Sequence, residues 1–357
     1  MKISIAKQHQ GMAVIIAMVA VTVLTIMAGL FAYSMKVETH LAANANNDEQ
    51  LLWMGRAGVE LARYVVALEN KQQYDSLNQI WAGGPGAGSE TNSALMGLSL
   101  TDYPVGDKGT VSVKIIDLER KVNVNGAQPV LLQQVLTTMG VDAGDITAVS
   151  DGILDWVDAD DSTRPAGAES DYYQGQNPPY YAKNAPMDDI SELMYIKGIT
   201  PAMYYGASIT NTQVMGFQRH QLGFGHAPGE EPNYAFGLKD VFTPFSSGKI
   251  NINTADANVL QLIPGVDQAA ADAILKWRAG PDGQDGTEDD TPFQNPGQLA
   301  AAGVNPQALG QIGTFVTTKS TTFEVHVTAR ITDYTREFVA IIYRNGASVQ
   351  TVGFYWK

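Results

Sequence analysis

An uncharged apolar run close to the N-terminus constrains this chain most. Residues 12–35 contain no charged side chain, and the first charge after them is Lys36. A helix rises 1.5 Å per residue, so this run would span about 36 Å, enough to cross a bilayer core of about 30 Å. Lys2 and Lys7 precede the run, and positive charge stays on the cytoplasmic side of a membrane. We therefore expect residues 12–35 to be a transmembrane segment, with the bulk of the chain on the far side.

The sequence after this run argues against an ordinary secretory signal. Such a signal would end in a small-x-small cleavage site. Here apolar residues instead continue at three- and four-residue spacing through Leu51, Val59 and Val66, which is typical of a helix. We expect one helix to run to about Leu68, as part of a head segment at residues 36–120. A plain membrane anchor remains the alternative.

Gly11 stands directly before the apolar run. A short basic leader that ends in Gly and is followed at once by an uncharged helix resembles a prepilin-type signal. In that family, a prepilin peptidase cuts after the Gly on the cytoplasmic side and N-methylates the new first residue. The resemblance implies that residues 1–11 are a leader, that the cut falls between Gly11 and Met12, and that Met12 is methylated. The apolar segment is retained and becomes the packing stem of a helical fibre.

Three segments have the pattern of strands, and the first is far from the other two in the chain. They are Val111–Asp117, Thr322–Arg330 and Glu337–Arg344, the last two joined by a polar link at Thr332–Arg336. The expected fold class is α+β and pilin-like: a long N-terminal helix packed on a small antiparallel sheet, which residues 319–357 complete. The roughly 200 residues between the strands must then form an insertion.

The expected insertion contains an internal repeat. One copy starts at Lys121–Asn125 (KVNVN) and the other at Lys249–Asn253 (KININ). Each copy continues with a leucine-bearing helix, a Gly-Val-Asp, an Ile-Leu-x-Trp and an acidic loop rich in Gly or Pro. We interpret the copies as two helical subdomains of SAM-like or helix-hairpin-helix type, at residues 121–210 and 249–318. An irregular segment rich in Gly, Phe and Pro, residues 211–248, separates them, and its role is open.

The second copy suggests DNA binding as an alternative function. Asn251–Ala255 and Pro264–Asp267 resemble a helix-hairpin-helix, whose Gly-x-Gly turn offers N–H groups to a phosphate. Here Asp267 replaces the second Gly, as Asp142 does in the first copy, and a carboxylate repels a phosphate. The net charge of −14 also disfavours nucleic acid. A compact structural hairpin explains the motif better.

Two acidic loops are the best ligand candidates. Calcium prefers six to eight oxygen ligands on a flexible loop, and Gly permits the required turns. Neither loop has the EF-hand spacing, so a solvated run of charges is the alternative. The candidates in the first acidic loop (residues 155–171) are Asp155, Asp158, Asp160, Asp161, Glu169 and Asp171. Those in the second acidic loop (residues 282–290) are Asp282, Asp285, Glu288, Asp289 and Asp290.

No catalytic set emerges from the sequence. The chain has no cysteine, its five histidines share no ligand spacing, and the common nucleophile and metalloprotease motifs are missing. Paired carboxylates abound, but they do not indicate glycoside chemistry without a known separation. We therefore expect no enzyme, and a membrane-anchored hydrolase is the weakest alternative.

Together these features resemble one family. The stretches Ile153–Asp161, Gly167–Tyr173 and Pro178–Tyr180, with the stem and the repeat, are similar to protein K of type II secretion systems, the large minor pseudopilins. Most pilin-like stems carry a Glu at mature position five, where it meets the amine of the subunit above. The protein K family omits it and commonly starts with Met, as Ile16 and Met12 do here. A subunit at the tip has no subunit above it.

The resemblance implies a single-pass protein of the inner membrane with its bulk in the periplasm. It would cap the tip of the pseudopilus together with other minor pseudopilins, which it contacts through its N-terminal helix and head. In this way it would support protein export across the outer membrane. Exported proteins are candidate partners of the head. The resemblance also implies calcium as a cofactor in the helical region, without saying which carboxylates bind it.

Overall fold

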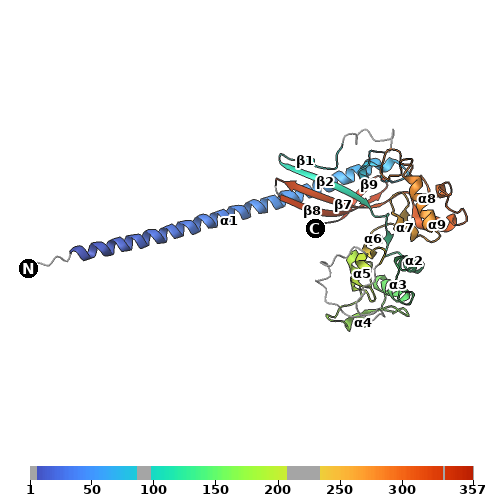
Figure 1. Cartoon of the computed structure of the whole chain (residues 1–357), viewed down its shortest axis with the longest axis horizontal. Helices are drawn as coiled ribbons and strands as arrows, with labels where there is room; N and C mark the ends of the chain where they lie inside the picture. The colour runs from blue at the N-terminus through green and yellow to red at the C-terminus, as the bar shows by residue number, and fades with distance from the viewer. Residues whose placement is uncertain (1–5, 87–97, 207–233, 333, 357) are drawn as a thin grey trace, which may run out of the picture.

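In a computed structural model, a long rod projects from a folded head (Figure 1). The structure describes residues 6–86, 98–206, 234–332 and 334–356. The rod is helix α1 (Ala6–Leu68), whose 63 residues extend over about 95 Å. It ends at Leu68, as the apolar periodicity predicts. Its part from Met12 to Thr39 has a mean hydropathy of 2.7 and is not buried against the rest of the protein. By length and composition this part could cross a membrane.

The head contains a five-stranded antiparallel sheet with the strand order β1-β2-β7-β8-β9. The strands are β1 (Tyr103–Val105), β2 (Gly109–Asp117), β7 (Thr322–Ile331), β8 (Tyr334–Asn345) and β9 (Ser348–Trp356). β2 pairs with β7 although the whole insertion separates them in sequence. The expected α+β architecture, a long helix on an antiparallel sheet with a large insertion, is confirmed.

The sheet is larger than the sequence pattern predicts. The three expected strands are present as β2, β7 and β8, but the edge strands β1 and β9 were not predicted. The expected polar link at 332–336 is shorter, because β8 already begins at Tyr334. β9 lacks alternation, with most of its residues exposed, and its pairing with β8 is interrupted by a register shift between Ile341 and Ile342.

Close packing joins α1 to one face of the sheet. Inward-facing residues alternate along β2 and β7, and Val113 pairs with Val327 in the register. The C-terminal half of α1 lies across these strands. Two helix glycines permit this approach: a Cβ added at Gly58 would lie 2.4 Å from Val327 Cγ1, and one at Gly55 would lie 2.5 Å from Phe338 Cδ2. Larger residues there would push the helix off the sheet.

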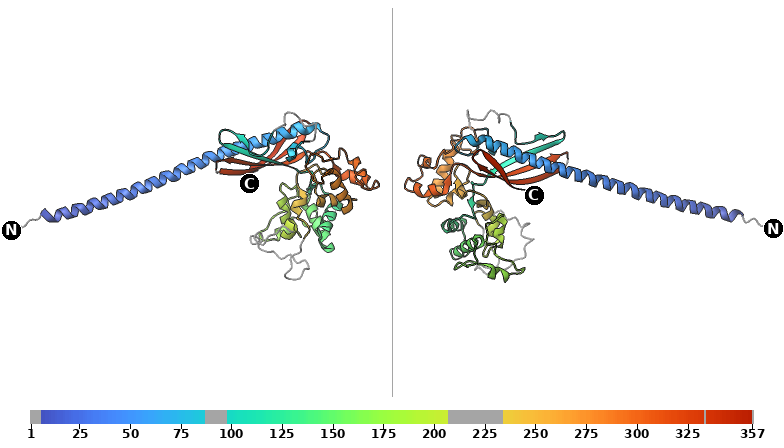
Figure 2. Two further views of the ribbon diagram at one scale, coloured as in Figure 1. Left: turned by 45° about the horizontal axis from the view of Figure 1, so that its top comes forward. Right: turned by 180° about the vertical axis from the view of Figure 1, so that it is seen from behind.

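The chain between β2 and β7 forms two helical units at the end of the sheet away from the stem (Figure 2). Before the first strand of the sheet, two short 3-10 helices follow α1, at Glu69–Lys71 (η1) and Ile80–Ala82 (η2), and they are not part of these units. The first helical unit contains β3 (Val122–Asn123), α2 (Pro129–Met139), α3 (Ala143–Val157), α4 (Ser170–Gln174), η5 (Ile190–Tyr195), α5 (Pro201–Tyr205), α6 (Leu238–Val241) and β4 (Phe242–Thr243). The second helical unit contains β5 (Ile250–Asn251), α7 (Ala257–Gln261), α8 (Gln268–Arg278), η8 (Pro296–Ala300), α9 (Leu309–Phe315) and β6 (Val316–Thr317).

Corresponding residues of the two units make corresponding contacts. β3 pairs in parallel with β4, and β5 pairs in parallel with β6. The amide of Asn125 donates to Met187 O over 3.0 Å and accepts from Met187 N over 2.7 Å. Asn253 exchanges the same two bonds with Phe293, over 2.9 and 2.8 Å. The two units thus tie their first strand to the segment after the acidic loop in the same way. The SAM-like or helix-hairpin-helix type of the units stays a prediction.

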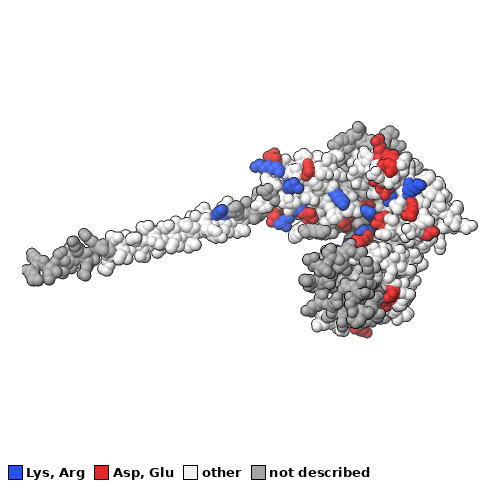
Figure 3. All heavy atoms as spheres, viewed as in Figure 1, with Lys and Arg blue, Asp and Glu red and all other residues white. Residues whose placement is uncertain are grey.

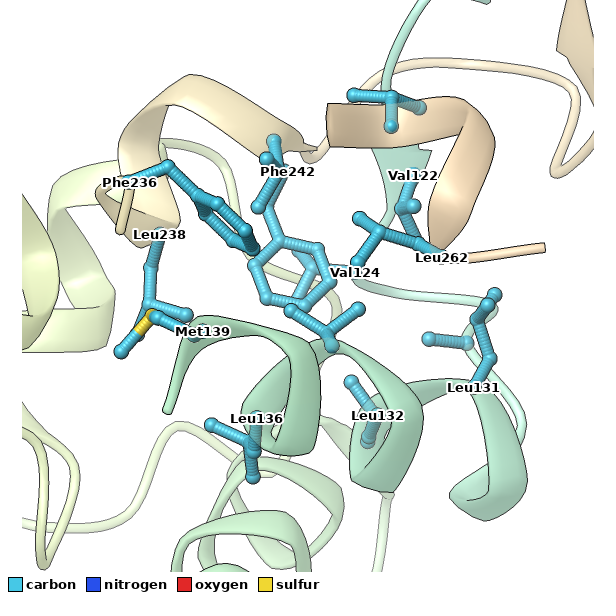
Figure 4. Packing of buried hydrophobic residues seen from close by; sticks show 14 of the residues in the cluster. Val122, Val124, Leu131, Leu132, Leu136, Met139, Phe236, Leu238, Phe242 and Leu262 are labelled. Carbon is cyan, nitrogen blue, oxygen red and sulfur yellow. The ribbon is translucent and has the colours of Figure 1, made fainter. Parts of the chain in front are cut away.

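One apolar core fills both helical units and the space between them. Leu131, Leu132, Val135, Leu136 and Met139 form the buried stripe of α2, and Figure 4 shows it facing Phe236, Leu238 and Phe242 of the later segment. Leu262 of the second unit lies at the same core. Of the irregular segment predicted at 211–248, the part up to residue 233 lies outside the described residues. Its last part forms α6 and β4 and packs into this core.

A buried polar network joins the helical units to the sheet. Asp117, at the end of β2, accepts hydrogen bonds at Oδ2 from Asn251 (3.1 Å), Thr254 (2.6 Å) and Ser320 (2.7 Å). Burial, and next the charge of Glu119, raises the pKa of Asp117 to about 8. These three partners and Glu119 lie where the chain leaves the sheet, returns to it or begins the second unit. The network therefore holds the insertion in place against the sheet.

Candidate functional site

The apolar stem is the first candidate site. From Met12 to Thr39 most of its large side chains, such as Ile16 and Phe31, are more than half exposed. Figure 3 shows the described part of the stem as largely uncharged, with charged side chains gathering on the head. Exposed apolar surface of this extent is stable only in a bilayer or against other apolar helices.

The expected cleavage point lies within the stem helix. The backbone at Gly11 and Met12 belongs to α1, and Met12 opens the apolar span with its side chain exposed. Residues 1–5 of the expected leader lie outside the described residues. Cleavage and methylation at this point stay predictions.

The first acidic loop encloses a buried cluster of charges. Asp155, in the last turn of α3, is fully buried, and its Oδ1 accepts a hydrogen bond from Arg164 Nη1 over 2.8 Å. The same Nη1 also pairs with Asp158 Oδ2. Gly167 lies against the cluster, because a Cβ added there would be 1.9 Å from Asp155 Oδ2. One arginine therefore bridges two carboxylates from the end of one helix.

Glu169 has no such partner. It is 2% exposed, and among the described residues neither of its carboxylate oxygens has a hydrogen-bond partner, nor does Oδ1 of Asp158. Burial, and then repulsion from Asp155, Asp158 and the other loop aspartates, raises the pKa of Glu169 to about 7. A buried carboxylate without a donor is costly. The first acidic loop thus holds more buried negative charge than Arg164 neutralises.

The other candidates of the first acidic loop lie outside this cluster. Asp160 and Asp161 are exposed and accept hydrogen bonds from Ser162 N (2.9 Å) and Ser170 N (3.3 Å). Hydrogen bonding to the side chains of these two serines, and then to their backbone and to Asn184, holds the pKa of both carboxyls below its usual range. Asp171 is exposed in the first turn of α4. The structure therefore brings together Asp155, Asp158 and Glu169 but not the remaining three.

The second acidic loop is organised around a cation of the protein itself. Arg278, at the end of α8, is 4% exposed. Its Nε and Nη2 donate to the two oxygens of Asp285 over 2.9 and 2.7 Å, and its Nη1 donates to the carbonyls of Ile252 (3.0 Å) and Ala255 (2.6 Å). A bidentate arginine–carboxylate pair is the strongest form of side-chain ion pair.

The remaining aspartates of this loop accept hydrogen bonds within it. Asp282 accepts from Gln284 N (2.7 Å), Asp289 from Thr287 Oγ1 (2.8 Å) and Asp290 from Gly286 N (2.8 Å). Glu288 is exposed. Within the described residues, no three acidic or histidine side chains are arranged as a preformed metal site. The calcium prediction is therefore untested by the geometry, although Glu169 and Asp158 offer free oxygens.

The hairpin of the second unit is poorly suited to hold a phosphate. Gly265 adopts a φ of +90°, as the turn requires, but Asp267 caps α8 by accepting from Ala270 N over 2.8 Å. The carboxylate thus occupies the helix N-terminus that would face an anion. Of the two bases predicted to assist, Arg278 is engaged with Asp285 and only Lys276 is exposed.

Sequence reasoning missed the roles of the two arginines. The sequence pattern predicts no ion pair for Arg164 or Arg278. A signal was present, since Arg164 is the single base within the first acidic loop and Arg278 is the base nearest to the second. The pairings themselves depend on the fold, because Ile252 and Ala255 lie more than twenty residues before Arg278.

Known proteins with similar sequence support the family. The family model described as "Type II secretion system (T2SS), protein K" matches residues 113–207. Type II secretion system protein K of Pseudomonas aeruginosa is 24% identical over 76% of this chain and 72% of its own length. This chain is thus similar to type II secretion system protein K over about three quarters of its length. The putative protein K of Escherichia coli K12 is 33% identical, over 28% of this chain and 34% of its own length.

A solved structure shares the fold. A chain in the crystal structure of the GspK–GspI–GspJ complex from the type 2 secretion system of enterotoxigenic Escherichia coli superposes with a TM-score of 0.62. The match covers 88% of this chain and 99% of that chain, at 18% identity. The chain therefore has the fold seen there. Its apolar N-terminal helix fits a single-pass protein of the inner membrane.

Proposed function

We propose that this chain is a minor pseudopilin that caps the tip of a type II secretion pseudopilus and supports protein export. The observation that carries the proposal is the exposed apolar helix Met12–Thr39, continuous with the helix that packs on the sheet of the head. Such a stem can pack against stems of the same kind in a fibre. The chain would cross the inner membrane once, with its head in the periplasm.

The proposal includes processing at Gly11. Replacement of Gly11 by Trp should block the prepilin peptidase, so the membrane-extracted protein keeps residues 1–11. The wild type should lose these residues and gain one methyl group on Met12, which intact-mass spectrometry detects. A shortened, methylated G11W protein would contradict the proposal. The matched change Gly29→Ala, at a stem glycine with open space around its Cβ position, should leave processing unchanged.

The proposed partners are other minor pseudopilins. A protein of related fold was crystallised in the GspK–GspI–GspJ complex. The apolar stem of this chain suits side-by-side packing against other apolar stems. Cysteine is absent from the chain, so single cysteines introduced on the stem can be cross-linked without background. Cross-links to other pilin-like subunits should form at stem positions and not at the exposed Asp171 of the helical region.

Calcium is the proposed cofactor of the first acidic loop. Glu169 and Asp158 supply unpartnered oxygens, and the cluster around them carries an excess of buried negative charge. A hard divalent cation would neutralise that charge and order the loop. Chelation with EGTA should lower the melting temperature of the full chain in detergent, because a ligand that binds the folded state stabilises it. An unchanged transition would refute the calcium proposal.

A further inference from the structure

The two helical units neutralise their acidic loops in different ways. Each loop follows a tryptophan at the end of a long helix, Trp156 in α3 and Trp277 in α8. In the first unit the residue after the tryptophan is Val157, and in the second it is Arg278. This single difference puts a permanent positive charge at the base of the second acidic loop.

Arg278 already binds the oxygens that a metal ion would need at this point. Four of its hydrogen bonds go to the two Asp285 oxygens and to the carbonyls of Ile252 and Ala255. Carboxylate and carbonyl oxygens are also the ligands that calcium prefers. A calcium ion at this point would have to displace a buried guanidinium, and the displaced cation would lose all four partners.

Buried unpartnered oxygens distinguish the loops. Among the described residues, those in the first acidic loop are Asp158 Oδ1 and both carboxylate oxygens of Glu169, and the second acidic loop contributes none. In the first loop, the buried Asp155 and Glu169 and the half-buried Asp158 face one arginine. In the second loop, the charges of Arg278 and the solvent-accessible Asp285 cancel, and the half-buried Asp290 accepts hydrogen bonds from Gly286 N and Thr287 N.

We propose that Arg278 serves as the built-in cation of the second acidic loop, so that calcium binds at the first acidic loop only. The inference rests on the calcium proposal above and narrows it. Of the eleven carboxylates predicted as ligands, the five of the second loop, Asp282, Asp285, Glu288, Asp289 and Asp290, are then structural. The second loop keeps its conformation without metal.

Hydrogen–deuterium exchange of the full chain in detergent tests this loop by loop, with calcium alone as the probe. On addition of EGTA, amides of the first acidic loop should exchange at least tenfold faster, and those of the second should not change. Faster exchange of the second loop on chelation would overturn the inference while leaving the calcium proposal intact. No change in either loop would overturn both, by removing the calcium proposal on which the inference rests.

Calorimetric titration of calcium into two variants, one from each loop, gives an independent measurement of calcium affinity. Glu169→Gln should weaken calcium binding at least tenfold, whereas Asp282→Asn, which changes an exposed acid of the second loop, should leave it unchanged. Weaker binding in Asp282→Asn would contradict the inference. Arg278→Lys keeps the charge but loses the bidentate geometry. It should speed exchange in the second loop, and unchanged exchange there would count against the assignment.

Discussion

At the scale of single residues, Asp117 governs how the insertion is joined to the sheet. Its carboxylate is buried where β2 ends, and its four hydrogen-bond donors come from Glu119 N and from Asn251, Thr254 and Ser320. The other charged groups in the network are Asp75, Glu119, Lys319 and Arg344. Burial, and next the charges of the two neighbouring acids, Glu119 and Asp75, favour the protonated form of Asp117.

This environment makes the stability of the protein depend on pH. Burial raises the pKa of Asp117 to about 8, above its unfolded value of about 4. The folded state therefore holds a proton that the unfolded state releases between these values, so stability falls as the pH rises from 5 towards 8. The change Asp117→Asn should reduce this loss of unfolding free energy by roughly one to a few kcal/mol. Urea unfolding at pH 5.5 and 8.5 measures the difference in unfolding free energy between the two pH values.

A control separates this effect from a general loss of charge. Asp107 is exposed in the turn between β1 and β2. Asp107→Asn should leave the pH dependence of wild type in place. If Asp117→Asn also retained the full decline, the buried carboxyl would not be its source.

At the scale of elements, the contact between α1 and the sheet depends on the lack of a side chain at Gly58. Leucine there would clash with Val327, whose β-branched side chain has restricted χ1 rotation and cannot adopt another rotamer to make room. Overpacking costs about 1–3 kcal/mol, more than the gain of about 1 kcal/mol from replacing a helical glycine. Gly58→Leu should lower the melting temperature of the head by several degrees. Gly29→Leu, on the open stem, should not, and equal melting of both variants would contradict the packing argument.

The elements that sequence could predict are those with strong local patterns. The 63-residue helix, β2, β7, β8 and α2 all show clear periodicity, and the repeat of KVNVN and KININ marks where each helical unit begins. β9 was missed because an edge strand with exposed residues carries little periodic signal, and it forms through its pairing with β8. The acidic loops were found by composition, but the burial of Glu169 and the partners of Arg278 are set by tertiary contacts that no local pattern encodes.

At the scale of the whole molecule, the position of the helical units bears on the place of the chain in a fibre. They lie at the end of the head opposite to the protruding stem (Figure 1). In a fibre of parallel stems, that is the side on which the next subunit would add its head. The insertion would obstruct that addition, which supports the proposal that the chain ends a fibre and is not repeated along it.

The proposed capping function therefore predicts one location for this chain. When fibres are assembled from the major pilin-like subunit together with this chain, gold-labelled antibody against the helical units should mark one end of each fibre. Raising the amount of this chain relative to the major subunit should shorten the fibres, because each added cap ends one. An antibody against the major subunit, used as the control, should mark the whole length. Regular labelling of this chain along the fibre would contradict capping, because the insertion would then fit between successive heads.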